Sequence, residues 1–250
     1  MGEIISVISG KGGVGKSTCA WLVGSASAEL NRSVLIADLS EGASDLELFG
    51  KYVGRTAYHY LDVLEGNCRI SDAFCEVGEN HLYVLPAPKK RLHTLEKGLR
   101  LQRLILALKK EFDLVLLDVP AHPSFIDLSE EVSDRSMVVT TPHAPSLRAL
   151  KGVTERIPER VPGLLVINRV LPSRVREGVL RTPEEIVEES GLPLIGLIPE
   201  DPAAEVLSDE PALRKVRSFP AGEACFEIAE RLNGKDVPFH APKAGRGRRG

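Results

Sequence analysis

A glycine-rich segment near the start of the chain has the residue types and spacing of a phosphate-binding loop. It consists of Gly10, Lys11, Gly12, Gly13, Val14, Gly15, Lys16, Ser17 and Thr18. Glycines let the backbone turn so tightly that several N–H groups face one point. In such a loop these N–H groups cradle the α- and β-phosphates, Lys16 reaches the β- and γ-phosphates, and the Ser17 hydroxyl binds Mg²⁺. The segment therefore predicts a polyphosphate site that holds magnesium.

The sequence on either side of this segment supplies the context that a phosphate-binding loop needs. Residues 4–9 form an apolar run that predicts a buried strand, and residues 19–30 are mostly small and predict a helix. A helix start contributes unpaired N–H donors and the positive end of the helix dipole. A glycine-rich turn without function is the alternative, but the order of strand, turn and helix favours the phosphate site.

Apolar runs alternate with helical patterns along the rest of the chain. The runs cover residues 33–37, 82–85, 114–117, 137–139, 164–167 and 194–198. Leu101 to Leu108 has helical spacing, and Thr182 followed by Pro183 predicts a capped helix start. Runs rich in Val, Leu and Ile between helices indicate an α/β fold, with a doubly wound, mostly parallel sheet and helices on both faces.

Composition limits the class of protein. The 250 residues are 43% apolar with a net charge of −3, which fits one large globular domain and gives no overall field for nucleic acid. No apolar stretch reaches the length of about 18 residues that a spanning helix needs. The four cysteines form no C-x-x-C pair, so neither a zinc site nor a dithiol is indicated. With no leader pattern before the first strand, we expect a cytoplasmic protein.

Polar residues with candidate roles follow two of the predicted strands. Asp118 follows 114–117 in the manner of a Walker B carboxylate that faces Mg²⁺, although many strands end in aspartate. Asn168 follows 164–167, and its amide suits either an adenine edge or a helix cap. Because ligands bind at the carboxyl ends of parallel strands, these side chains are candidates for one site.

The segment from Lys11 to Thr18 resembles the deviant Walker A loop of the MinD/ParA ATPases. The resemblance implies a P-loop NTPase fold and ATP with Mg²⁺ as ligands. It also implies an ATP-dependent homodimer, because in that family the early lysine, here Lys11, reaches the partner subunit's nucleotide. A second cation at a developing phosphate charge has an electrostatic rationale. A solvated surface charge is the alternative for Lys11.

The similarity covers about residues 3–232, and the segments 61–66, 82–87 and 198–201 resemble MinD rather than ParA. It places Asp38, otherwise a turn-forming aspartate, near Mg²⁺ at the start of the first switch segment. The metal ligands that we expect are Ser17, Asp38 and Asp118. The residues expected beside adenine, partly through backbone, are Asn168, Arg169, Pro199 and Asp201. The candidate catalytic residues are Lys11, Lys16, Asp38 and Ser40.

Two positions depart from the family pattern in ways that bear on hydrolysis. Ser40 stands where the family has a second acid that orients the attacking water, and Glu41 beside it would point elsewhere along an extended backbone. A hydroxyl holds water but is a poor proton acceptor. His122 replaces a glycine after the Pro-Ala of the second switch. We therefore expect ATP binding with slow or partner-dependent hydrolysis.

The C-terminal segment departs from the family as well. We expect an ATPase domain over residues 1–232 and a flexible basic tail, rich in Gly, Pro and Arg, over residues 233–250. MinD proteins end in an amphipathic membrane helix, whereas proline and glycine would break a helix here. The tail's cations suit anionic lipid at the inner membrane surface, nucleic acid, or solvent alone.

Four functions are compatible with these features. The leading interpretation is a MinD-like dimeric switch ATPase in spatial positioning, such as division-site placement, with a regulatory or activating protein partner. A ParA-type segregation ATPase would bind DNA through basic residues near one predicted helix, namely Arg148, Lys151, Arg156 and Arg160. The third is phosphate transfer to a small molecule, for which no acceptor constellation is recognisable. The fourth is a nucleotide-gated scaffold with little hydrolysis.

Overall fold

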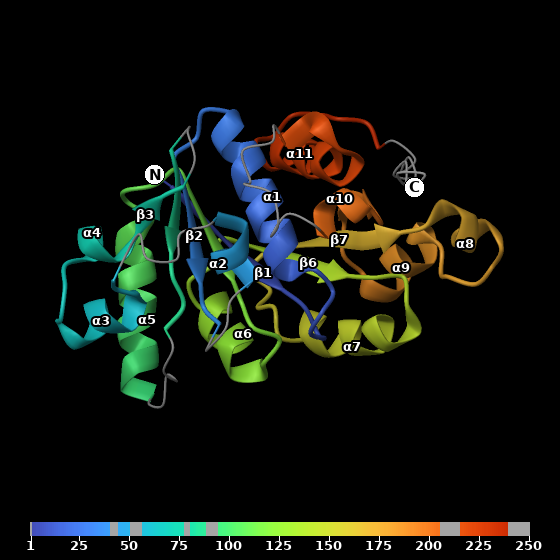
Figure 1. The fold of residues 1–250 in the computed structure, drawn as a ribbon. Helices are drawn as coiled ribbons and strands as arrows, with labels where there is room; N and C mark the ends of the chain where they lie inside the picture. The colour runs from blue at the N-terminus through green and yellow to red at the C-terminus, as the bar shows by residue number, and fades with distance from the viewer. Residues whose placement is uncertain are drawn as a thin grey trace.

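The fold is built on a single sheet with helices on both faces (Figure 1). The computed structural model describes residues 2–40, 45–50, 57–77, 81–88, 95–205 and 216–239. The strands are β1 (Glu3–Ile8), β2 (Val34–Asp38), β3 (Cys75–Glu76), β4 (Leu82–Leu85), β5 (Leu114–Asp118), β6 (Arg135–Thr140), β7 (Gly163–Val170) and β8 (Leu194–Pro199). The helices are α1 (Lys16–Glu29), α2 (Asp45–Gly50), α3 (Tyr60–Glu65), α4 (Ile70–Ala73), α5 (Leu95–Leu108), α6 (Pro123–Glu130), α7 (Ala144–Thr154), α8 (Pro172–Arg176), α9 (Pro183–Ser190), α10 (Pro202–Glu205) and α11 (Pro220–Leu232), with a 3₁₀ turn at Val216–Ser218.

The strand order is β3-β4-β2-β5-β1-β6-β7-β8. All neighbouring strands are parallel except β3, which pairs antiparallel with β4 at the edge. The predicted doubly wound, mostly parallel sheet is confirmed. Since parallel strands point the same way, the loops that follow β1, β2, β5, β7 and β8 lie along one edge of the sheet.

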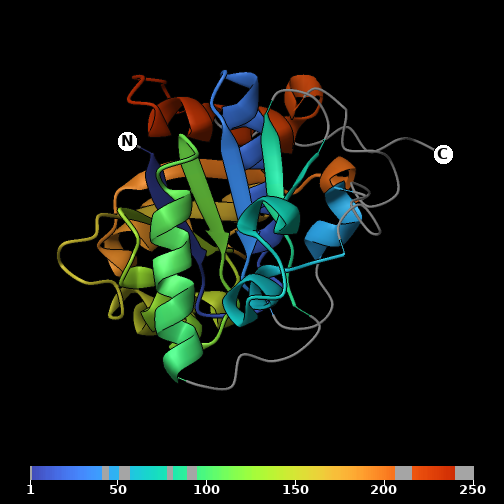
Figure 2. The ribbon, with the colours of Figure 1, turned by 90° about the vertical axis from the view of Figure 1, so that its left-hand side faces the viewer.

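Side chains alternate between two apolar cores, one on each face of the sheet. In β1, Ile5 and Val7 face the core with α1 and α11, whereas Ile4 and Ile8 face the core with α5, α6 and α7. Figure 2 shows α5 on its side of the sheet, running in nearly the same line as the strands, as a crossover helix does. The strands are apolar on both sides because both of their faces are covered.

Local signals set several helix boundaries. Thr182 accepts a hydrogen bond from the Glu185 N–H at 3.2 Å and Pro183 opens α9, so the predicted capped start is confirmed. Helix α1 begins at Lys16, three residues before the expected Cys19, because Gly15 adopts the left-handed conformation that ends the loop. Leu101 to Leu108 lies within α5 as predicted.

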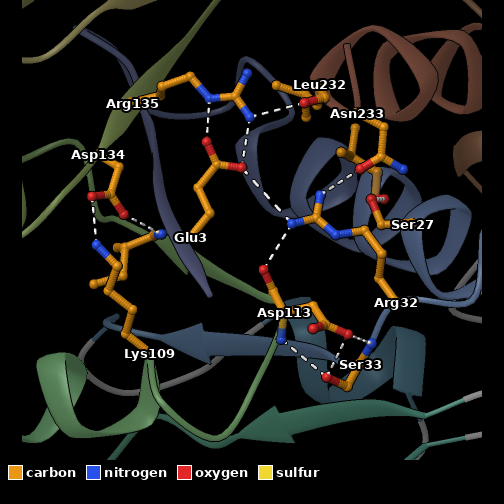
Figure 3. Close-up of polar contacts among 12 residues, drawn as sticks. Glu3, Ser27, Arg32, Ser33, Lys109, Asp113, Asp134, Arg135, Leu232 and Asn233 are labelled. Atoms are coloured by element: carbon orange, nitrogen blue, oxygen red, sulfur yellow. Dashed lines mark hydrogen bonds and ion pairs between the residues drawn. The ribbon is translucent and has the colours of Figure 1, made fainter. Parts of the chain in front are cut away.

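Ion pairs tie the C-terminal end of α11 to the edge of the sheet that lies opposite the predicted site (Figure 3). The Arg135 guanidinium binds both carboxylate oxygens of Glu3 and donates to the Leu232 carbonyl at 3.0 Å. Arg32 donates to the Asp113 carbonyl at 2.7 Å and lies 3.8 Å from Glu3. These side chains join the starts of β1, β2, β5 and β6 to α11.

Residues beyond α11 contact the body of the domain through Arg231. Its guanidinium donates to the Val237 and Pro238 carbonyls at 3.0 and 2.9 Å and lies 4.1 Å from the centre of the Phe239 ring. Residues 233–239, which are the described part of the expected tail, therefore contact the domain through Arg231. Residues 240–250 lie outside the described residues, so flexibility of that segment stays a prediction.

Replacing Arg135 by alanine removes a bidentate partner from a three-quarters buried Glu3 carboxylate. We expect R135A to lower the free energy of unfolding by about 2 kcal/mol, because the remaining carboxylate loses its hydrogen bonds. Urea denaturation followed by circular dichroism measures this loss. As a control, R181A removes an exposed i,i+4 ion pair with Glu185 and should cost less than about 0.5 kcal/mol. Equal losses in the two variants would contradict the proposed importance of the Glu3–Arg135 pair.

Candidate nucleotide-binding site

The loop between β1 and α1 presents backbone donors at the carboxyl edge of the sheet. Gly13 and Gly15 have φ values of 76° and 91°, which residues with a side chain rarely adopt. Helix α1 has no side-chain cap and no acidic residue in its first turn. The N-cap residue, Gly15, has no side chain that could cap the helix, and the helix dipole favours an anion at this end.

The outer side of the loop is open, and its inner side is fixed. A Cβ atom at Gly12 or Gly13 would meet no atom within 4 Å, which leaves room for a ligand above the backbone. On the inner side, Val14 is buried in the core, and the Ser9 hydroxyl donates to the Lys11 carbonyl at 2.7 Å. The Lys11 side chain is exposed. The loop therefore has open space on one side, where a polyphosphate would lie, and contacts that hold its backbone on the other side.

Two carboxylates lie beside this loop. Asp38 and Asp118 are paired in register at the ends of β2 and β5, and both are buried. Burial and the charge of Asp118 raise the pKa of the Cys19 thiol to about 12, while Lys16 acts in the opposite direction. The Lys16 and Asp118 charges thus both act on the first turns of α1. Carboxylate oxygens such as those at the ends of β2 and β5 are ligands that Mg²⁺ prefers.

A cavity of about 360 Å³ adjoins the loop. Its walls include Gly15, Thr18, Cys19 and Leu22 from the loop and α1. The other expected base-site residues also line it: Asn168, Arg169, Pro199 and Asp201. The structure therefore brings together all four residues expected beside adenine. The two halves of the site, loop and cavity, meet at Gly15.

A bulge in β7 aims Asn168 at the loop. The pairing of β7 with β8 shifts between Ile167 and Val170, and Arg169 has a φ of 55°. The Asn168 amide nitrogen donates to the Val14 carbonyl at 2.8 Å, and its amide oxygen accepts from the Arg169 N–H at 2.9 Å. The helix-cap alternative for Asn168 is wrong, because Asn168 lies inside β7 and the next helix is capped at Leu171.

The Asp201 carboxylate is used inside the fold. Its two oxygens accept hydrogen bonds from the Ala203 N–H at 3.0 Å and the Ala221 N–H at 2.9 Å. These bonds join the first turns of α10 and α11 to the end of β8. The Asp201 carboxylate is thus occupied by backbone donors, and contact with a base through the backbone around Pro199 stays a prediction.

Comparisons with known proteins agree with this geometry. The family model of the CobQ/CobB/MinD/ParA nucleotide binding domain matches residues 5–211. The septum site-determining protein MinD of Synechocystis is 31% identical over 246 residues, which are 96% of this chain and 92% of that protein. The chain belongs to the CobQ/CobB/MinD/ParA family.

Two solved structures support the same assignment. A chain of the MinC:MinD cell division protein complex of Aquifex aeolicus matches with a TM-score of 0.86 at 29% identity, covering 96% of this chain and 99% of that one. MinD of Pyrococcus horikoshii, complexed with Mg-ADP, matches with a TM-score of 0.78 at 26% identity, covering 93% and 96%. The chain thus has the P-loop NTPase fold of this family along nearly its whole length.

Ser40 and His122 are the two positions near the site that depart from the family pattern. The Ser40 hydroxyl donates to Asp38 Oδ1 at 2.6 Å, and the Ser40 N–H donates to the same oxygen at 2.9 Å. His122 is exposed, immediately precedes α6 and contacts the Ser124 hydroxyl at 2.8 Å. Residues 41–44, which include Glu41, lie outside the described residues, so the rest of the first switch segment stays a prediction.

The basic residues that would serve a DNA-binding member of the family are largely paired. Arg156 donates to both oxygens of Asp127 at 2.8 and 2.9 Å. Arg160 lies 3.5 Å from Glu131, and Lys151 lies 3.9 Å from Glu155. Three of the four basic residues therefore already have a carboxylate nearby, which reduces what they offer for counterion release on DNA. In the described part of the chain, no helix is long and apolar enough to cross a membrane.

Sequence reasoning missed the walls that α2 and α11 give to the cavity. Leu48 from α2 and Ala221 and Cys225 from α11 line it. The i,i+4 spacing of Ala221 and Cys225 is a signal for a closely packed helix face. Nothing in the local sequence says that this face meets α1. Burial keeps the pKa of the Cys225 thiol well above its usual range, so it acts as an apolar wall.

Gly15 is the position at which the loop and the cavity depend on one another. A Cβ atom there would lie 2.3 Å from the Asn168 amide nitrogen, and φ is positive. We expect G15A to weaken ATP·Mg²⁺ binding by about tenfold or more, because the loop must move away from Asn168. Isothermal titration calorimetry measures the affinity. G178A is the matched control, with a φ of 69° in open space, and should cost about 1 kcal/mol of stability without changing the affinity. Similar affinities for G15A and the native chain would contradict the assignment of the site.

Proposed function

We propose that this chain is a MinD-like ATPase that acts as a nucleotide-dependent switch in division-site placement. The observation that carries the proposal is the open loop of backbone donors joined at Gly15 to a closed-in cavity, with two buried carboxylates beside it. The similarity to septum site-determining proteins over 96% of the chain supports the biological setting. A purine and ribose fit the cavity, and a triphosphate fits the loop.

Each predicted residue then has a defined task. Loop N–H groups bind the α- and β-phosphates, and Lys16 neutralises charge on the β- and γ-phosphates. Ser17, Asp38 and Asp118 would hold Mg²⁺, which would neutralise negative charge on the phosphates. Asp38 and Asp118 are buried and lie in register at the ends of neighbouring strands, so the sheet holds their backbone in place.

Recognition of the base falls to the cavity. An amide has two N–H donors and two acceptor lone pairs. Asn168 uses one donor for the Val14 carbonyl and one lone pair for the Arg169 N–H. The second N–H and the second lone pair suit an adenine edge. Arg169 and the backbone at Pro199 and Asp201 complete the rim. The Asn168 amide that would contact adenine is thus the same group that holds the Val14 carbonyl of the phosphate-binding loop.

The dimer that we propose depends on Lys11, the exposed lysine at the start of the loop. Lys11 belongs to the loop but its side chain is exposed to solvent, which suits a partner's triphosphate better than its own. The ATP-bound form would be a homodimer with two nucleotides between its subunits, and loss of the γ-phosphate would open it. Such a switch works because the two states differ in affinity for the nucleotide.

Hydrolysis is expected to be slow without a partner. The Ser40 hydroxyl donates its hydrogen bond to Asp38, so it presents only weakly basic lone pairs to an attacking water. A protein partner is supported by the MinC:MinD complex among the similar structures. The setting would be cytoplasmic, with contact to the inner membrane surface through the basic C-terminal residues.

Lys11 tests the dimer. We expect the native chain to elute as a dimer with ATP·Mg²⁺ and as a monomer with ADP. K11A should stay monomeric with ATP while binding it, because the lysine that completes the partner's site is gone. Size-exclusion chromatography with light scattering makes the comparison. K110A changes an exposed lysine near the far end of α5 and should dimerise normally. ATP-dependent dimers of K11A would count against the cross-subunit contact.

Ser40 tests the rate of hydrolysis. S40D restores a carboxylate two residues after Asp38, so we expect turnover of ATP to rise by about tenfold or more. Phosphate release under saturating ATP measures it. S71D adds an exposed carboxylate on α4 and should leave the rate unchanged. A native rate equal to or above that of S40D would refute the proposed reason for slow hydrolysis.

A further inference from the structure

A buried carboxylate lies between α6 and the central strands, outside the nucleotide site. The Glu130 carboxylate accepts a hydrogen bond from the Ser6 hydroxyl at 2.5 Å on one oxygen, and from the Ser136 hydroxyl on the other. The Ser6 and Ser136 hydroxyls lie 3.1 Å apart. All three residues are at most 1% exposed. Arg160, in the loop before β7, donates to the Glu130 backbone carbonyl at 2.9 Å.

This cluster places a carboxylate and two hydroxyls in a core that is otherwise apolar. Ser6 and Ser136 are paired in register on β1 and β6, where neighbours such as Ile4 and Val138 on the same face are apolar. Burial raises the pKa of Glu130, so holding it ionised at neutral pH is unfavourable. Apolar side chains of similar volume commonly replace buried charges with equal or better stability. The core alone therefore does not explain why a carboxylate occupies this position.

The position of Glu130 relates the cluster to the nucleotide site. Helix α6 follows the loop 119–122, which begins directly after Asp118. Ser6 lies four residues before Gly10, where the phosphate-binding loop starts. The last residue of α6 is thus bonded to the strand that carries that loop. At the other end of α6, in the part of the chain that the structure describes, no hydrogen bond joins the His122 or Ser124 side chain to a strand.

We infer that Glu130 is a positioning residue for the ATPase site. Its two hydroxyl contacts fix the C-terminal end of α6 against β1 and β6 and so set the loop 119–122 relative to the phosphate-binding loop. The N-terminal end of α6, which carries His122, is the end left to respond to the γ-phosphate. The catalytic part of this inference rests on the proposed ATPase activity.

Three variants separate positioning from packing. E130L fills the space without hydrogen bonds, and we expect an unfolding temperature equal to or above the native one, ATP affinity within about twofold, and kcat reduced about tenfold. E130Q can accept from one serine and donate to the other, so it should keep most of kcat. E131L changes the exposed neighbouring residue and should behave like the native chain.

Hydrogen exchange supplies a readout that needs no hydrolysis. In E130L, with or without nucleotide, the backbone amides of residues 119–125 should exchange about tenfold faster than in the native chain and in E131L. A folded E130L with native kcat and native exchange over this segment would overturn the inference, as would an E130Q as impaired as E130L. A native chain that binds no ATP would instead overturn the proposed function, and exchange would still decide the role of Glu130.

Discussion

The hydrogen bond from the Asn168 amide to the Val14 carbonyl connects the phosphate-binding loop to the end of β7. A loop that contains four glycines is costly to hold in one conformation, and its N–H groups bind a phosphate well only if they already face it. Ser9 holds the start of the loop and Asn168 holds its middle. Gly15 is required because a side chain there would occupy the space of the Asn168 amide. The Asn168–Val14 hydrogen bond therefore connects the positions of the loop, the β7 bulge and the cavity wall.

The parallel sheet divides the molecule into a functional edge and a structural edge. At the carboxyl edge, Asp38, Asp118 and Asn168 are buried yet polar, and the loop beside them is open. At the opposite edge, Glu3 and Arg135 bind each other and hold α11 (Figure 3). Charges at the second edge satisfy one another within the chain. At the first edge, Asp38 and Asp118 are paired in register at the ends of β2 and β5, where we propose that they hold the metal.

Buried polar groups recur wherever a segment of the site must be held. Asp201 fixes the starts of α10 and α11 beside the cavity, and Glu130 fixes the end of α6 behind the loop after Asp118. Both carboxylates are bonded to groups far away in sequence, so each restrains one element relative to another. Such groups stabilise less than apolar packing would, but their directional bonds specify position. The Ser40–Asp38 contact differs, since it joins residues only two positions apart at the end of β2.

The sequence by itself determined what short-range patterns encode. The glycine spacing defined the loop, apolar runs defined most strands, and Asp38 and Asp118 were placed by the strand ends that they follow. The tertiary structure alone decided how distant residues meet. The bulge in β7 directs Asn168 at Val14, which lies 154 residues away in the sequence. The register of β1 with β6 brings Ser6 and Ser136 together beside Glu130. The cavity walls formed by α2 and α11 could likewise not be predicted, because a helical pattern shows which face of a helix is buried but not which element covers that face. Contacts between distant residues depend on register and packing across the whole sheet, and no local stretch of sequence carries that information.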